Sequence, residues 1–313
     1  MSRIERLVFF GTPAFAVPAL EALVAAGRRP LLVVSQPARP AGREQRPAEP
    51  PVAERALQLG LAVAQPARVR DQEFLSELAG LRPDLAVVVA FGQIFPQELL
   101  DLPRLGCLNV HASLLPRWRG AAPITAAIAA GDAETGVAVQ RMEAGLDTGP
   151  VYAARATPIA AGENAGELGA RLARLGGELL LEVLDALERG AAAAIPQDLA
   201  LATQAPKFGA PELLDPTRPA GELARRVRAF NPEPGTFLAA RGERLKVLRA
   251  RASAAPTAEE PGTVVGVGPG SLAVAVGGGT VLDLELVQRP GGRPLAGRDF
   301  ANGLRLRPGD RLL

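Results

Sequence analysis

The sequence predicts an α/β domain with a doubly wound, mainly parallel sheet, followed by a smaller β-barrel domain. Short apolar runs alternate with segments whose apolar residues recur at helical spacing; the runs are residues 7–10, 30–34, 61–64 and 85–90. These runs are continuously apolar, which is typical of strands buried on both faces of a parallel sheet. Downstream of residue 262, shorter strand-like runs are separated by Gly and Pro, a pattern that favours a small barrel.

A leucine stripe predicts the helix that closes the first domain. Residues 163–189 carry apolar side chains at helical spacing, including Leu168, Leu172, Leu175, Leu179 and Leu180. In doubly wound sheets, ligands bind beyond the carboxyl ends of the strands. We therefore expect the functional site among the segments at those ends, which are residues 11–13, 91–92 and 109–113.

A group of prolines marks the expected domain boundary. Five prolines between residues 196 and 219 interrupt the helical pattern, which predicts a linker on the surface. We therefore divide the chain into residues 1–205, which include the start of the linker, and residues 206–313. In the second domain we expect one helix at residues 220–230 and strands at residues 263–267, 271–276 and 281–287.

Composition limits the class of protein. The chain has 313 residues, 48% of them hydrophobic, which is enough for two packed domains. No apolar run reaches the roughly 18 residues of a membrane span, and a signal-type hydrophobic region does not follow Met1, so we expect a cytoplasmic protein with no membrane partner. With one cysteine and one histidine, the sequence disfavours a disulfide framework and a zinc site, and metal-free chemistry is expected.

The basic residues are unevenly distributed. The formal net charge is +2, and residues 206–313 carry 16 of the 35 basic and 11 of the 33 acidic side chains. This excess favours a polyanionic partner such as nucleic acid, although it is also compatible with solubility alone. Residues 35–51 form a long, proline-rich segment with Arg39, Arg43 and Arg46, which could clamp phosphates. A disordered excursion is the alternative interpretation of this segment.

The only histidine, His111, lies at a predicted strand end together with Asn109. Residues two apart in a strand point to the same face, so the amide and the imidazole can converge on one small group. Asp147, in the segment 145–149 with its flanking glycines, is the expected carboxylate partner. A capped strand end with a core histidine and a turn aspartate is the alternative. The motifs of serine hydrolases, P-loop proteins, zinc proteases and dinucleotide-binding proteins do not occur in the sequence.

Several segments resemble the methionyl-tRNA formyltransferase family: residues 106–124 (GCLNVHASLLPRWRGAAPI), 131–137, 145–149 and 228–232. The resemblance spans essentially the whole chain. It implies a Rossmann-like formyltransferase fold followed by an OB-like barrel that binds tRNA. It also implies that the protein transfers a formyl group from 10-formyltetrahydrofolate, the formyl-donor cosubstrate, to the α-amino group of initiator methionyl-tRNA. The product would be N-formylmethionyl-tRNA for translation initiation.

The resemblance also implies roles for individual residues. Asn109 and His111 would stabilise the oxyanion of the tetrahedral intermediate, and Asp147 would take up the proton of the amine. Folate contacts are implied for Phe91, Gly92, Ser113, Leu114, Leu115 and Pro116. Contacts with tRNA are implied for Arg39 and Arg43. No metal is implied, and members of the family usually act as monomers.

The sequence departs from the family pattern at some positions but keeps the Asn, His and Asp trio. Phe91 and Gln204 stand where the family usually has Tyr, and Ala38 stands where it usually has an acid. Two other functions remain open: a formyltransferase that acts on a small amine such as an amino sugar, and a non-catalytic RNA-binding protein on an α/β scaffold. Folate binding would separate the formyltransferases from the RNA-binding protein.

Overall fold

The computed structural model describes residues 3–41 and 46–313, which form two compact units. The first unit comprises Met1–Pro123, Glu134–Pro158 and Gly169–Ala205, and the second comprises Ile124–Ala133, Ile159–Leu168 and Pro206–Leu313. The second unit therefore includes two segments that the sequence analysis places in the first domain. Within this unit, Arg225 and Arg228 donate hydrogen bonds to the carbonyl oxygens of Ala129 and Glu163, which ties both segments to it.

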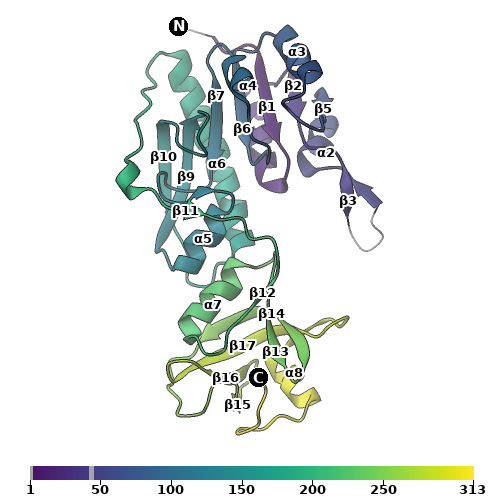
Figure 1. Cartoon of the computed structure of the whole chain (residues 1–313), viewed down its shortest axis with the longest axis vertical. Coiled ribbons are helices and arrows are strands. Elements are labelled where there is room, and N and C mark those ends of the chain that lie inside the picture. The colour runs from purple at the N-terminus through teal and green to yellow at the C-terminus, as the bar shows by residue number, and fades with distance from the viewer. Residues whose placement is uncertain (1–2, 42–45) are drawn as a thin grey trace. The chain divides into compact units, whose positions relative to one another are not determined.

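The first unit is built on a seven-stranded sheet (Figure 1). Its strand order is β10-β9-β7-β6-β1-β2-β5. The bounds are β1 (Leu7–Gly11), β2 (Leu32–Val34), β5 (Val63–Ala64), β6 (Leu85–Val89), β7 (Cys107–His111), β9 (Glu134–Arg141) and β10 (Val151–Pro158). All neighbours from β7 to β5 pair in parallel, whereas β9 pairs antiparallel with both β7 and β10. The predicted doubly wound, mainly parallel sheet is confirmed, because the four predicted apolar runs coincide with β1, β2, β5 and β6.

Helices pack around this sheet and bury its apolar strands. They are η1 (Ala14–Ala16), α1 (Val17–Ala25), α2 (Pro51–Gln58), α3 (Gln72–Gly80), α4 (Gln97–Asp101) and α6 (Ala165–Glu188). Helix α5 (Pro123–Ala130) falls almost wholly in the second unit. Every residue of β1 and β6 is buried, as expected for central strands covered on both faces. Phe10 lies edge-on to Phe91 and Phe95 with ring centroids 5.4 and 4.9 Å apart, which fills the space at the carboxyl ends of these strands.

Helix α6 corresponds to the predicted helix at residues 163–189 and packs closely against β7 and α1. Leu168, Leu172, Leu179 and Leu180 are buried, whereas Leu175 is half-buried. A Cβ atom on Gly176 would lie 2.8 Å from a methyl carbon of Val110, and one on Gly177 would lie 3.2 Å from the carbonyl oxygen of Pro18. Gly176 therefore lets the helix approach the strand that carries Asn109 and His111, and Gly177 lets it approach α1.

The end of α6 is fixed to the amino-terminal segment by an ion-pair cluster. Arg28 Nη2 lies 2.6 Å from Asp185 Oδ1 and 2.8 Å from Glu188 Oε2, and Glu188 Oε1 accepts a hydrogen bond from the backbone N–H of Ile4 at 2.9 Å. The hydrogen bond from Arg28 holds the pKa of Glu188 below its ordinary value of 4.5. The cluster therefore stabilises the fold most when Glu188 is ionised.

We expect Glu188→Gln to lower the free energy of unfolding by about 1 kcal/mol at pH 7. The variant keeps an acceptor for the N–H of Ile4 but loses the charge and the acceptor oxygen that face Arg28. Because the folded-state pKa of Glu188 is lowered, its contribution is present above pH 4.5 and is lost as the pH falls through the folded-state pKa. Urea titrations at several pH values should thus show the difference at pH 7 and its loss at low pH. Glu178→Gln, on the exposed face of α6, is the control and should change little.

Two short strand pairs extend the first unit beyond its main sheet. β3 (Arg39–Ala41) and β4 (Arg46–Ala48) form an antiparallel hairpin within the predicted segment 35–51, and the hairpin projects from the sheet next to α2 (Figure 1). Arg43 lies outside the described residues. β8 (Arg119–Gly120) pairs in parallel with β11 (Gln204–Ala205), which follows η2 (Leu199–Leu201). This pairing brings a segment from the end of the first unit back to the end of β7.

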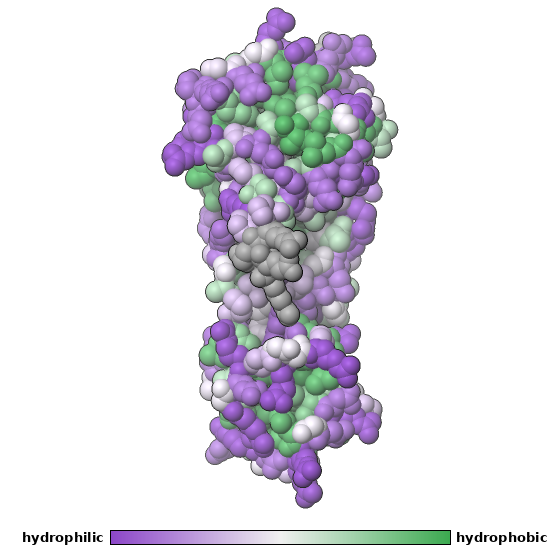
Figure 2. Space-filling view, turned by 90° about the vertical axis from the view of Figure 1, so that its right-hand side faces the viewer, coloured by the Kyte–Doolittle hydropathy of each residue, from purple (hydrophilic) through white to green (hydrophobic). Residues whose placement is uncertain are grey.

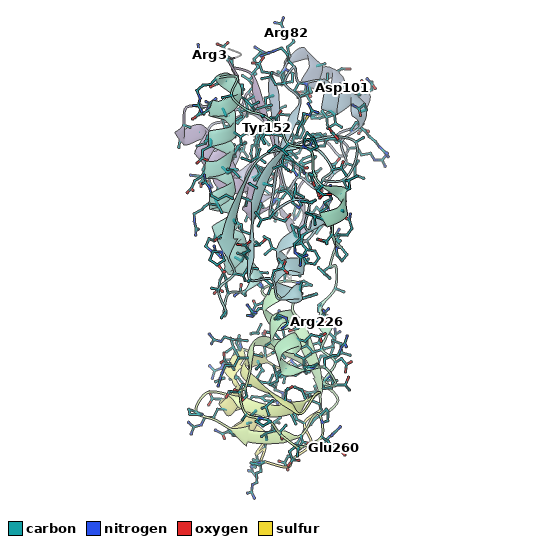
Figure 3. The ribbon with its side chains drawn as sticks, turned by 90° about the vertical axis from the view of Figure 1, so that its left-hand side faces the viewer. Arg3, Arg82, Asp101, Tyr152, Arg226 and Glu260 are labelled. Atoms are coloured by element: carbon teal, nitrogen blue, oxygen red, sulfur yellow. The ribbon has the colours of Figure 1, made fainter. Side chains whose placement is uncertain are left out.

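The second unit is β-rich, as predicted from its strands separated by Gly and Pro. Its sheet follows the order β12-β13-β14-β17-β16-β15, and β18 pairs with β17. The bounds are β12 (Glu212–Leu213), β13 (Thr236–Ala240), β14 (Glu243–Ala252), β15 (Val264–Val267), β16 (Leu272–Val276), β17 (Thr280–Gln288) and β18 (Pro294–Ala296). Helices α7 (Ala220–Ala229) and α8 (Gly297–Gly303) cover an apolar core that contains Leu223, Val247, Leu284 and Phe300. Arg226, labelled in Figure 3, fastens α7 to β12 through a bidentate contact with Glu212.

The surface interleaves polar and apolar residues. Figure 2 shows hydrophobic residues on both units that are bordered by hydrophilic ones. Among the largest exposed apolar side chains are Leu57, Ile94 and Leu146, and the last two lie beside the cavity described below. Within the part of the chain that the structure describes, none of the helices combines the length and the apolar character needed to cross a membrane.

Candidate active site

The structure brings Asn109, His111 and Asp147 together at the carboxyl end of β7. Asn109 Nδ2 donates a hydrogen bond to Asp147 Oδ1 at 3.2 Å, and His111 Nδ1 lies 3.6 Å from Asp147 Oδ2. Asn109 and His111 come from one face of the strand, and Asp147 comes from the loop between β9 and β10. The expected convergence of an amide, an imidazole and a carboxylate is therefore present in the folded chain.

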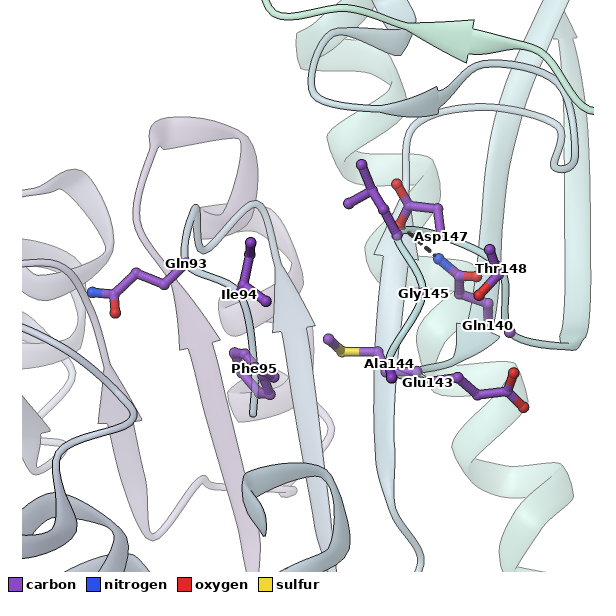
Figure 4. A pocket seen from close by; sticks show the side chains of 12 residues that line it. Gln93, Ile94, Phe95, Gln140, Glu143, Ala144, Gly145, Asp147 and Thr148 are labelled. Carbon is purple, nitrogen blue, oxygen red and sulfur yellow. Dashed lines mark hydrogen bonds between the residues drawn. The ribbon is translucent and has the colours of Figure 1, made fainter. Parts of the chain in front are cut away.

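The carboxylate of Asp147 is surrounded by N–H donors. Besides Asn109, Gln140 Nε2 donates to Oδ1 at 2.8 Å, and the backbone N–H of Gly120 donates to Oδ2 at 2.9 Å (Figure 4 shows the bond from Gln140). Each of these bonds fixes the position of a carboxylate oxygen. The site thus presents an oriented carboxylate beside the imidazole.

Backbone geometry fixes the loop that carries Asp147. Asp147 has a φ of +52°, which is the left-handed region that aspartate adopts more readily than most residues. A Cβ atom on Gly149 would lie 1.8 Å from the carbonyl oxygen of Arg141, so this position requires glycine. The two features turn the chain sharply after β9 and aim the carboxylate at the end of β7.

His111 has an oxygen acceptor at each ring nitrogen. Its Nε2 atom lies 2.9 Å from the carbonyl oxygen of Trp118, which can only accept a hydrogen bond, so Nε2 carries a hydrogen. Its Nδ1 atom faces the carboxylate of Asp147. The ring is therefore held at Nε2 by the backbone of Trp118, and Nδ1 lies beside the carboxylate. The side chain is only 6% exposed, so its orientation is well constrained.

A cavity of about 200 Å³ opens beside Asp147 (Figure 4). One side is formed by residues 93–95, which follow β6, and the other by Gln140 and residues 142–149. The lining combines apolar side chains such as Phe95 and Leu146 with a few polar groups, the usual composition of a small-molecule site. Ile94 is 87% exposed and Leu146 is 66% exposed, so the apolar surface is available to a ligand.

The residues for which the resemblance implied folate contacts are not among those that line this cavity, and their folate contacts stay a prediction. Phe91 is buried in the aromatic cluster with Phe10 and Phe95. Ser113 is fully buried, and its hydroxyl donates to the carbonyl oxygen of Arg117 at 2.6 Å. Leu114, Leu115 and Pro116 are half-buried. Gly92 is approached by Gln36, whose Nε2 atom would lie 2.7 Å from a Cβ atom at that position.

Gln140 and the cavity residues 93–95 and 142–144 were not identified from the sequence. Gln140 is directly opposite Asn109 in the β7–β9 register, and its side chain is 1% exposed. A polar residue inside the apolar run of β9 was the signal that could have identified it. Residues 93–95 and 142–149 follow the ends of β6 and β9, so their place at the sheet edge could have been predicted once the β7–β9 pairing was known.

A second hollow and the buried Cys107 lie outside the trio. A second, more open hollow of about 500 Å³ is lined by residues that include Asp101 and Tyr152, which Figure 3 labels, but none of the Asn, His and Asp trio reaches it. Burial raises the pKa of the Cys107 thiol to about 12, so this side chain is not a thiolate nucleophile at neutral pH.

Within residues 3–41 and 46–313, no cluster of three or more His, Cys, Asp or Glu side chains could hold a metal ion.

The comparisons with known proteins agree with this geometry. The sequence matches the family described as "Formyl transferase" over residues 5–184, and the family described as "Formyl transferase, C-terminal domain" over residues 211–305. These two matches identify the protein as a formyl transferase. A methionyl-tRNA formyltransferase from Halorhodospira halophila is 50% identical over 97% of this chain and 98% of that protein. One from Ectopseudomonas mendocina is 49% identical over 96% of this chain and 95% of that protein. The chain belongs to the methionyl-tRNA formyltransferase family.

Solved structures of more distant proteins share the fold. An N-formyltransferase from Helicobacter canadensis, in complex with folinic acid and dTDP-3-aminofucose, matches 92% of this chain and 100% of its own. Its TM-score is 0.65 at 15% identity. HypX from Aquifex aeolicus, in complex with tetrahydrofolic acid, has a TM-score of 0.64 at 16% identity, and this chain spans 51% of its length. At these identities the likeness shows the fold alone.

Proposed function

We propose that the protein transfers the formyl group of 10-formyltetrahydrofolate to the α-amino group of initiator methionyl-tRNA. The observation that carries this proposal is the oriented Asn109, His111 and Asp147 site in a chain that is 50% identical, over nearly its full length, to a methionyl-tRNA formyltransferase. A non-catalytic RNA-binding protein would have no use for an oriented carboxylate and imidazole. A small-amine formyltransferase has the same chemistry but is not supported by these relatives.

The reaction needs stabilisation of an oxyanion and the movement of one proton. The amine nitrogen forms a bond to the formyl carbon, and the bond from that carbon to N10 of the folate breaks. One proton passes from the amine to N10 of the departing tetrahydrofolate. Asn109 uses one amide hydrogen for Asp147 and can offer the second to the formyl oxygen. His111 would supply the other donor from Nδ1, because Nε2 is bonded to the carbonyl oxygen of Trp118 whereas Nδ1 lies 3.6 Å from Asp147, too far for a hydrogen bond. Asp147 accepts the proton of the amine, directly or through a water molecule.

The cavity beside Asp147 is the proposed binding site of the folate. Its apolar walls would accept a flat ring, and Asp147 and Gln140 provide polar groups at its end. A titration with 5-formyltetrahydrofolate tests this location. We expect saturable binding that is weakened at least tenfold by Ile94→Asp and unchanged by Leu57→Asp, an exposed site on α2. Saturable RNA binding without any folate binding would contradict the proposal and favour the RNA-binding alternative.

The hairpin of β3 and β4 is the proposed contact with the tRNA, through Arg39 and Arg43. Arg39 is exposed, and its Nη2 atom donates to Gln36 Oε1 at 2.5 Å, so the guanidinium is held where the chain leaves β2. The excess of basic side chains in residues 206–313 supports a second contact with the same polyanion. We also propose that the protein acts as a monomer in the cytoplasm, where aminoacyl-tRNA is available.

We expect Arg39→Ala to weaken binding of initiator tRNA and to reduce the slope of log affinity against log salt by about 1, because one phosphate contact is lost. Filter binding at a series of salt concentrations measures both effects. Arg29→Ala is the control. It removes the same charge from the segment that precedes β2, at the amino end of the strand, whereas Arg39 follows the carboxyl end. Equal salt slopes for the two variants would exclude Arg39 from the tRNA interface.

A further inference from the structure

A segment from the end of the first unit returns to the candidate active site. There it contacts the loop that follows β7 and the loop between β9 and β10. This return segment, residues 195–205, pairs with Val151 through Ile195, with both backbone N–O distances at 2.8 Å. Its Thr203 accepts hydrogen bonds from the backbone N–H groups of Trp118 at 2.8 Å and Arg119 at 2.9 Å. The return segment thus joins the loop that follows β7 to the loop between β9 and β10.

Gln197 is the residue of the return segment that reaches into the site. Its Nε2 atom donates to the carbonyl oxygens of Asp147 at 2.9 Å and Gly149 at 2.6 Å, and lies 3.3 Å from Gln140 Oε1. Its Oε1 atom accepts from Arg119 Nε at 3.1 Å and Nη2 at 2.8 Å. A guanidinium only donates and a carbonyl oxygen only accepts, so these partners fix the orientation of the amide.

These bonds close a ring around the carboxylate of Asp147. Gly120, next to Arg119 in β8, donates its backbone N–H to Asp147 Oδ2, and Arg119 holds Gln197, which holds the backbone of Asp147. Arg119 is 5% exposed, so the anchor of this ring is itself buried. The left-handed φ of Asp147 is a conformation that persists where surrounding contacts hold it.

We propose that Gln197 is a positioning residue for formyl transfer, which holds the backbone of Asp147 and Gly149 so that the Asp147 carboxylate stays beside His111. Gln197 does this through the hydrogen bonds that its amide N–H groups donate. The inference rests on the proposed function, because the carboxylate that Gln197 positions is the proposed proton acceptor. A displacement of about 1 Å at such a group typically costs on the order of a hundredfold in rate.

The test compares kcat for three variants at saturating folate and tRNA. Gln197→Leu has nearly the same volume and removes both ends of the amide, and we expect kcat to fall about 10- to 100-fold. Gln197→Glu keeps two acceptor oxygens for Arg119 but cannot donate to the loop carbonyls, and we expect a similar fall. Gln72→Leu makes the same replacement at an exposed site on α3 and should leave kcat unchanged. Thermal unfolding confirms that each variant is folded.

A double-mutant cycle with Asp147→Asn distinguishes a positioning role of Gln197 from a general loss of structure. If Gln197 acts through the carboxylate, Gln197→Leu in the Asp147→Asn background should lower kcat less than about twofold. The inference would be overturned if Gln197→Leu lowered kcat by the same factor with Asp147 and with Asn at that position. A Gln197→Glu variant with wild-type kcat would also overturn it. An active wild type with an equally active Gln197→Leu refutes this inference alone. A wild type that transfers no formyl group refutes the proposed function, and this inference with it.

Discussion

Asp147→Asn is expected to lower kcat for formyl transfer by about a thousandfold, within the range typical of a general base. Asparagine keeps the size of the side chain and an acceptor for the N–H of Gly120. It loses the negative charge that faces His111 and the ability to take up a proton. Its amide hydrogens would also face the donors of Asn109 and Gln140, which now bind Oδ1. The effect should appear in kcat, with folate affinity nearly unchanged.

Single-turnover transfer with both substrates saturating measures this effect without a contribution from product release. Asp198→Asn is a matched control, because it makes the same change on the neighbouring return segment, where Asp198 accepts a hydrogen bond from the N–H of Ala200. The control should transfer at the wild-type rate. If folded Asp147→Asn protein keeps more than a tenth of wild-type kcat, Asp147 is not the proton acceptor.

His111→Ala is expected to lower kcat by about two orders of magnitude, the usual cost of losing one donor to an oxyanion. The ring is buried between the carbonyl oxygen of Trp118 and the carboxylate of Asp147, so the substitution also leaves a cavity. His111→Gln fills most of that space and can donate to the oxygen of Trp118. It should therefore unfold at nearly the wild-type temperature while remaining a poor catalyst.

Measuring Tm and kcat for both variants decides between a catalytic and a structural histidine. A structural histidine would give a lowered Tm together with wild-type turnover in the folded fraction, and His111→Gln would restore the Tm. The catalytic assignment requires that turnover stays low even where His111→Gln restores the Tm. Because His111 is the only histidine of the chain, no second imidazole can take over its role.

The sheet and the convergence of the Asn, His and Asp side chains could be predicted because their signals are local. Continuous apolar runs marked β1, β2, β5 and β6, and the two-residue spacing of Asn109 and His111 placed them on one face of β7. Asp147 could be proposed from its glycine-flanked segment. Each of these inferences uses only the periodicity or backbone freedom of a short stretch of sequence.

The environment of the trio could not be predicted, because it depends on residues distant in the sequence. Gln197 lies 50 positions from Asp147, and Gly120 contributes a backbone N–H that has no sequence signature. The placement of residues 93–95 along the cavity also has no local sequence signal. Ala90 and Gly92 both have positive φ values, of 47° and 85°, and the chain between them carries Phe91 into the core, which leaves residues 93–95 along the cavity.

The most direct test of the account is folate-dependent transfer of a labelled formyl group to initiator methionyl-tRNA. Elongator methionyl-tRNA, free methionine and a nucleotide-linked amino sugar serve as parallel acceptors in the same assay. We predict labelled N-formylmethionyl-tRNA from the initiator species, dependent on 10-formyltetrahydrofolate and abolished by Asp147→Asn. Formylation of the amino sugar or another small amine, with no transfer to either tRNA, would contradict the account.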